Sequence, residues 1–126
     1  MLPNVFPVLN TPEIQALVGN PSRIYDFGSA PPEAKAPYIT FWNVSGIPHD
    51  QLSGAPCSDF DTIQIDIYAG PHDSAKAQIR KLATLVRDAL DGAGIANRLI
   101  IQGRDNETRL FRVSLEADFI NNRATD

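Results

Sequence analysis

One long amphipathic segment constrains the fold of this chain more than any other feature. From residue 75 to residue 90, apolar side chains recur at 3.6-residue spacing on one stripe, formed by Ala75, Ile79, Leu82, Ala83, Val86, Ala89 and Leu90. Asp73 or Ser74 can cap the start of this helix, and Gly92 and Gly94 end it. The segment of about 18 residues spans roughly 27 Å, which is enough to cover a sheet of several strands.

The strands predicted on either side of this helix supply that sheet. Residues 38–44 are mostly aromatic and β-branched, which predicts a strand with both faces largely covered and core aromatic residues. Residues 62–68 alternate strictly, so the isoleucines lie on a core face and Asp66 lies on the outward face. Residues 98–102 and 111–119 flank a turn rich in Gly, Asp and Asn, which is typical of a β-hairpin with a charged outward face.

The N-terminal third contains short elements joined by stiff connections. Seven of the ten prolines lie in the first 37 residues. Thr11 and Pro12 start a short helix that ends at Gly19, and residues 23–27 form a brief strand before a proline-rich connector. The order is therefore helix, three strands, long helix, two strands. It predicts an α+β fold: an antiparallel or mixed β-sheet packed by one long helix and a short N-terminal helix.

Length and composition fit one small globular domain. The 126 residues carry 11 basic and 15 acidic side chains, a net charge of −4, and we expect a single domain over residues 1–126 with a polar tail at 121–126. No apolar run approaches the roughly 18–20 residues that cross a bilayer, and no secretory signal is visible, so no membrane role is expected. The single cysteine, Cys57, fits synthesis in a reducing cytosol. The acidic balance argues against a non-specific nucleic-acid binder.

No pattern in the sequence predicts catalysis, a metal or a cofactor. A metal-dependent hydrolase would have to use His49, His72, Asp59 and Asp61, which lack the spacing of known metal motifs. The two histidines are better interpreted as solvated loop residues. Cys57 lies beside acidic residues, where a reactive thiolate is disfavoured. We therefore expect that the protein is not an enzyme, and keep the hydrolase as an alternative.

One long connection points to a binding role. Residues 45–60 join two strands that a loop of about 2–5 residues can join, and loops above about 12–15 residues are usually functional or disordered. Ile47, Leu52 and Phe60 lie among its prolines and glycines, which is typical of a loop that becomes ordered on a partner. The alternative interpretation is an ordinary surface loop without a binding role.

A series of short segments forms a pattern over nearly the whole chain. In order they are Val18-Gly19, Arg23–Tyr25, Pro37–Trp42, Val44–Pro48, Leu52–Gly54, Ile63–Tyr68 and Thr108–Leu115. Each segment is degenerate by itself, so their order and spacing carry the information. In that order they resemble the tail completion (tail terminator) proteins of long-tailed bacteriophages and prophages.

The resemblance implies a structural virion protein and no catalytic residues. Such a protein forms a homo-hexameric ring at the head-proximal end of the tail tube, stops tail polymerisation and offers a surface for head-tail joining. The implied partners are other copies of the chain, the major tail tube protein and head-completion or connector proteins. DNA would pass through the lumen without specific binding. Assembly would take place in the host cytoplasm.

The same resemblance implies that the subunit and tube contacts lie in the long connection, residues 45–60, and at the edges of the sheet. The residues expected there are Ile47, Pro48, His49, Asp50, Gln51, Leu52, Ser53 and Asp59. A small monomeric adaptor that binds a peptide on a sheet edge is the alternative from another functional class.

Overall fold

A computed structural model describes residues 5–19, 21–31, 34–48, 58–72 and 74–122 of the chain. The helical elements are α1 (Val5–Leu9), α2 (Pro12–Val18), the 3-10 turn η1 (Asp26–Gly28) and α3 (Ala75–Gly92). The strands are β1 (Ile24–Tyr25), β2 (Tyr38–Pro48), β3 (Ser58–Ala69), β4 (Ala96–Arg104) and β5 (Phe111–Asn122).

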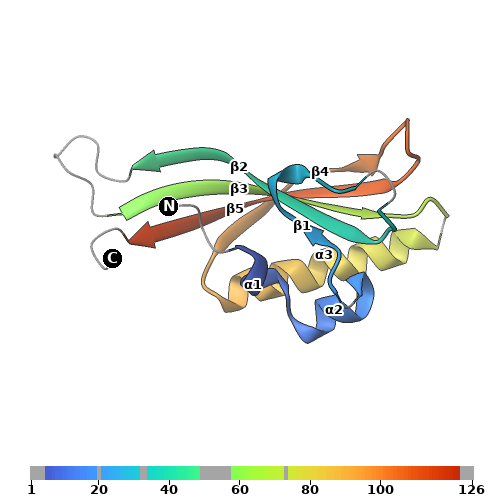
Figure 1. The fold of residues 1–126 in the computed structure, drawn as a ribbon, viewed down its shortest axis with the longest axis horizontal. Coiled ribbons are helices and arrows are strands. Elements are labelled where there is room, and N and C mark those ends of the chain that lie inside the picture. The colour runs from blue at the N-terminus through green and yellow to red at the C-terminus, as the bar shows by residue number, and fades with distance from the viewer. Residues whose placement is uncertain (1–4, 20, 32–33, 49–57, 73, 123–126) are drawn as a thin grey trace.

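The strands form one mixed sheet in the order β1-β2-β3-β5-β4. The short β1 pairs parallel to β2, and all other neighbours are antiparallel. In Figure 1 the three α-helices lie on one side of the sheet, with α3 running along it and α1 and α2 beside α3. The α+β prediction is confirmed, including the long helix and the short N-terminal helix.

The core lies between α3 and the two central strands. The stripe predicted for the helix is the buried one, with Leu82, Val86 and Leu90 fully shielded from water. It packs on the alternating residues of β3 and β5, where Ile65 and Leu115 are register partners and both 0% exposed. Burial of each such side chain contributes about 1.5–3 kcal/mol to folding.

The N-terminal segment adds a second set of apolar contacts. The Thr11 side chain accepts a hydrogen bond from the Ile14 backbone N–H at 3.3 Å, and Gly19 ends α2 with a φ of 91°, as predicted. The preceding helix α1 was not predicted, although its Val5 and Leu9 are buried. Pro7 lies in its first turns, where a missing N–H is tolerated.

The strands before α3 differ in length from the predicted ones. The predicted strand 23–27 is only Ile24–Tyr25, because the chain turns into η1 at Asp26. The predicted loop 45–60 is too long, because β2 continues to Pro48 and β3 begins at Ser58. A register shift between Asn43 and Ser45 absorbs one residue and lets pairing continue to Pro48 and Asp59. The connection is thus residues 49–57, outside the described residues.

The outer face of β2 is covered only in part, which corrects the prediction that both faces of residues 38–44 are largely covered. Thr40 is 4% exposed beside η1, but the strand is open further on. Trp42 and Val44 are 42% and 37% exposed, while Ile39 and Phe41 point into the core. The three α-helices lie on one side of the sheet (Figure 1), and the other side, on which η1 lies, is here called the open face. The aromatic composition of residues 38–44 alone does not distinguish a strand covered on both faces from a strand with one exposed face.

We predict that Ile65→Asp unfolds the protein. A carboxylate at this fully buried position has no counter-charge, and its cost of more than about 4 kcal/mol is comparable with the whole stability of a small domain. Circular dichroism and urea denaturation measure the loss. Ile101→Asp is the matched control, because Ile101 is 50% exposed and this variant is expected to stay folded. A soluble, cooperatively folded Ile65→Asp variant would contradict the strand parity.

Candidate functional site

A polar network crosses the open face between β3 and β5. The carboxylate of Asp66 accepts hydrogen bonds from the Ser114 hydroxyl at 2.6 Å, the Gln64 amide at 3.0 Å and the Arg112 guanidinium at 3.4 Å. Asp66 is on the outward parity that was predicted, but it is only 5% exposed because these partners cover it. A buried carboxylate with these donors is satisfied within the subunit, and it links β3 to β5.

A second charged group joins β4 to β5 on the same face. Arg98 contacts Glu116 at 3.0 Å and Asp118 at 3.0 Å, and Thr62 donates a hydrogen bond to Asp118 at 3.4 Å. The hydrogen bonds that Arg98 donates to the Asp118 carboxylate raise the pKa of its guanidinium, so this group stays charged. The Arg98 side chain is 46% exposed, which limits the contribution of these ion pairs to stability.

Aromatic side chains line the open face toward the β1 edge. The rings of Tyr38 and Tyr68 stack with centroids 4.9 Å apart, and Tyr25 meets Tyr38 edge-on at 6.1 Å. Tyr38 and Tyr68, together with Trp42 and residues of η1, border a hollow of about 470 Å³. Burial raises the pKa of both Tyr38 and Tyr68, with a smaller contribution from the negative charges of Asp105 on Tyr38 and Asp66 on Tyr68.

The opposite edge of the sheet is apolar and unpaired. Strand β4 is the last in the strand order, and within the described ranges no strand pairs on its outer side. Its consecutive residues Leu99, Ile100 and Ile101 are 48%, 39% and 50% exposed. An edge that presents free backbone groups together with apolar side chains is a template for pairing with another chain.

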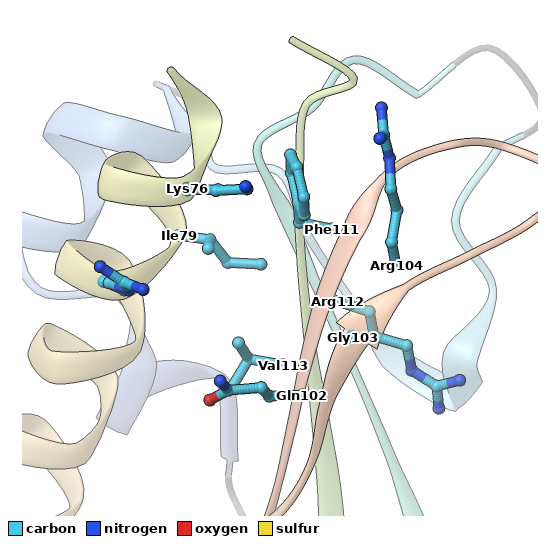
Figure 2. Close-up of a pocket in the computed structure, with 9 residues that line it drawn as sticks. Lys76, Ile79, Gln102, Gly103, Arg104, Phe111, Arg112 and Val113 are labelled. Carbon is cyan, nitrogen blue, oxygen red and sulfur yellow. The ribbon is translucent and has the colours of Figure 1, made fainter. Parts of the chain in front are cut away.

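A groove with positively charged walls lies between β4 and the N-terminal half of α3. It has a volume of about 310 Å³, and Figure 2 shows Lys76 and Ile79 of the helix facing Phe111, Val113 and Gln102 of the strands. The Lys76 Nζ lies 5.7 Å from the centroid of the Phe111 ring, and the Arg104 guanidinium carbon lies 4.9 Å from it. These distances are typical of cation–π contacts.

The β4–β5 turn fixes Arg104 at the end of this groove. Asp105 accepts hydrogen bonds from the Thr108 hydroxyl at 2.7 Å and from the Glu107 backbone N–H at 3.3 Å. These bonds lower the pKa of the Asp105 carboxyl, the Thr108 bond most strongly. Arg104 itself donates to the carbonyls of Arg109 and Pro71, both at 3.0 Å, so carbonyl oxygens hold it without neutralising its charge.

The structure places only part of the predicted interface. Ile47, Pro48 and Asp59 lie in the paired ends of β2 and β3, where Pro48 and Asp59 are register partners. His49, Asp50, Gln51, Leu52 and Ser53 lie outside the described residues. The groove was not predicted as functional, and the sheet edges were expected as contacts only in general, without naming β4. Two signals were available: the run Leu99-Ile100-Ile101 and the basic residues at the start of the long helix.

The hydrolase constellation is not assembled in the described part of the chain. Asp61 is 5% exposed and accepts a hydrogen bond from the Asn43 amide at 3.1 Å. His72 is exposed beyond the other end of β3, with its Nδ1 2.6 Å from the Ser74 hydroxyl. No group of three or more potential metal ligands exists among the described residues, and no helix there is long and apolar enough to cross a bilayer.

Comparison with known proteins identifies the class. The family model described as tail completion protein gp17 matches residues 7–120, and this is a family of structural virion proteins, not of enzymes. The chain is therefore a structural component of phage-like tails. More narrowly, it belongs to the family of tail completion protein gp17.

A solved structure shares the fold. A chain of the structure titled "Virion of native gene transfer agent (GTA) particle" aligns with a TM-score of 0.68 and 20% identity. The alignment covers 94% of this chain and 91% of that chain. Comparison with curated protein sequences gives no match. The resemblance to tail completion proteins seen in the sequence is thus confirmed.

We predict a loss of stability above about pH 10 that depends on Tyr38 and Tyr68. An unfolded tyrosine ionises near pH 10.0, and burial raises the pKa of both residues in the folded chain. The folded state therefore holds these protons more tightly, and this part of the stability is lost as the pH rises from the unfolded pKa through the folded one. Urea unfolding at about pH 9 and about pH 11 measures the loss. The double variant Tyr38→Phe/Tyr68→Phe is expected to show a smaller decrease, and an unchanged decrease would contradict the assignment.

Proposed function

We propose that this protein forms a homo-hexameric ring on the head-proximal end of the tail tube. The ring stops tube polymerisation and provides the surface on which head-completion or connector proteins join the tail. Its assembly takes place in the host cytoplasm before the finished virion is released. The observation that carries the proposal is the family match over residues 7–120.

The arrangement of the sheet supports a ring. A cyclic assembly with more than two copies needs two different patches on each subunit, related by a rotation that closes. The chain offers such a pair, because the β2–β3 ends and the groove beside β4 lie at opposite ends of the sheet. An isologous dimer would instead use one patch twice.

We place the subunit and tube contacts in the connection between β2 and β3 and the strand ends that carry it. The residues are Ile47, Pro48, His49, Asp50, Gln51, Leu52, Ser53 and Asp59. The segment combines apolar side chains with carboxylates, so it can bury surface against a partner and still select that partner by charge. DNA passes through the lumen without specific binding, which fits a chain of net charge −4.

We predict that the purified protein, mixed with the matching tail tube protein, caps tubes and shortens them. Multi-angle light scattering measures the mass of the protein alone and in the mixture, and electron microscopy measures tube lengths. A six-fold mass, or monomers that cap tubes, supports the proposal. The proposal is contradicted if the protein stays monomeric at all concentrations and leaves tube length unchanged. This result would support the adaptor alternative, in which a peptide binds to the free β4 edge.

We predict that Leu52→Asp weakens ring or tube contacts and leaves the fold intact. A carboxylate in place of an apolar anchor must be desolvated when the interface forms, at a cost of several kcal/mol. Capping of tubes and the unfolding free energy are measured side by side. Leu52→Ile is the matched control, because it keeps the apolar volume. An unfolded Leu52→Asp variant would mean that Leu52 packs within its own subunit. A folded variant that caps tubes normally would mean that Leu52 is not part of the interface.

A further inference from the structure

We propose that the groove between α3 and β4 receives the β2–β3 connection of a neighbouring copy of this chain. This inference rests on the proposed ring and names the surface that accepts the segment. It makes the contact head-to-tail: each copy inserts one end of its sheet into the other end of the next copy.

The groove is positively charged in a protein that is acidic overall. Its walls carry Lys76, Arg80 and Arg104, and no carboxylate belongs to its lining. Within the described residues, the ion pairs of the chain involve Arg98 and Arg112, and none neutralises those three side chains. In Figure 2 Arg112 turns away from the helix, in agreement with its ion pair to Asp66 on the open face. The charge facing the groove is therefore available to an acidic occupant.

The floor of the groove is apolar. Ile79 and Val113 are almost completely buried beneath it, at 5% and 8% exposure, and the Phe111 ring stands between Lys76 and Arg104. Further along β4, Leu99 is the register partner of the buried Leu115 and is 48% exposed, so apolar surface continues on the helix side of this free edge. A suitable occupant thus combines apolar side chains with negative charge in an extended backbone that can pair with an edge strand.

The connection between β2 and β3, taken together with the strand ends that carry it, has this composition. Residues 47–59 contain two aspartates, Asp50 and Asp59, and no lysine or arginine, and they contain the apolar Ile47 and Leu52. Its charge is thus opposite to that of the groove. Opposite charges on the two surfaces would favour the head-to-tail contact and disfavour contacts between like ends.

The two surfaces cannot meet within one subunit. Asp59 and Pro48 lie at one end of the central strands, whereas Ala69, Phe111 and Arg104 are aligned at the other end. Ala69 lies ten positions after Asp59 in β3, which corresponds to roughly 33 Å at about 3.3 Å per residue. Figure 1 shows the two strand ends and the β4–β5 turn on opposite sides of the molecule. The contact is therefore between copies, and the two patches differ, as a ring requires.

Disulfide cross-linking tests this contact, because Cys57 is the only cysteine and lies within the proposed occupant. Protein with Cys57 as its sole thiol is mixed with a tagged variant, Cys57→Ser/Gln102→Cys, whose sole thiol lies in the groove. A second variant, Cys57→Ser/Arg104→Cys, places the thiol at the end of the groove, at the register partner of Phe111. After mild oxidation, non-reducing electrophoresis separates the mixed disulfide from the two homodimers by size.

The control variant is Cys57→Ser/Gly92→Cys, because Gly92 is exposed at the far end of α3 and has open space around it. We expect at least about tenfold more mixed disulfide with one of the groove variants than with this control. Adding Lys76→Glu and Arg80→Glu to the groove variants is expected to reduce the yield about tenfold, which corresponds to about 1.4 kcal/mol. Both side chains are exposed on the helix surface, so the fold is retained.

The outcomes separate this inference from the ring itself. Mixed disulfide at the control level with both groove variants, from a protein whose ring or tube capping is normal, overturns the inference and leaves the ring intact. An unchanged yield after the charge reversal also overturns it, because the positive charge would then have no role. A third outcome is a strong, charge-dependent cross-link from a protein that neither forms rings nor caps tubes. That result supports the contact between the groove and the β2–β3 connection, and it contradicts the proposed ring.

Discussion

The packing of α3 against the central strands is the contact on which the rest of the structure depends. Strand β3 is paired along its whole length by β2 and β5, and its isoleucines meet the apolar stripe of the helix. A small domain has few other ways to bury enough apolar surface to offset the conformational entropy of folding. With one face of the sheet committed to the helices, the other face and the strand ends remain for contacts with other proteins.

The distribution of polar groups follows from this division. On the open face the buried Asp66 is satisfied by Ser114, Gln64 and Arg112, so its charge is balanced inside the subunit. At the end of the groove, by contrast, Arg104 is held by carbonyl oxygens and keeps its charge for an outside partner. The charge of Asp66 is thus paired within the subunit, whereas the cations of the groove have no carboxylate partner among the described residues. For a protein of a tail completion family, whose role is assembly, we consider the second surface the more informative one.

The elements that the sequence predicted well are those with a strong period or a strong cap. The helix stripe, the alternation in residues 62–68 and the Thr11 cap each rest on local geometry, and the structure confirms all three. The predictions were less successful at Trp42 and at the ends of β2 and β3. Whether an aromatic strand is covered depends on where the helices pack, and strand length depends on pairing with neighbours distant in the chain.

The sequence by itself determined the α+β class, the single long helix and the family resemblance, because these depend on local periodicity and on the order of segments. The tertiary structure alone decided that Lys76 and Arg104, 28 positions apart in the chain, flank one phenylalanine ring. It also decided that the β2–β3 ends lie far from that groove and that β4 is left at the edge. The physical reason is that surface patches are set by strand order and register, which no local pattern encodes.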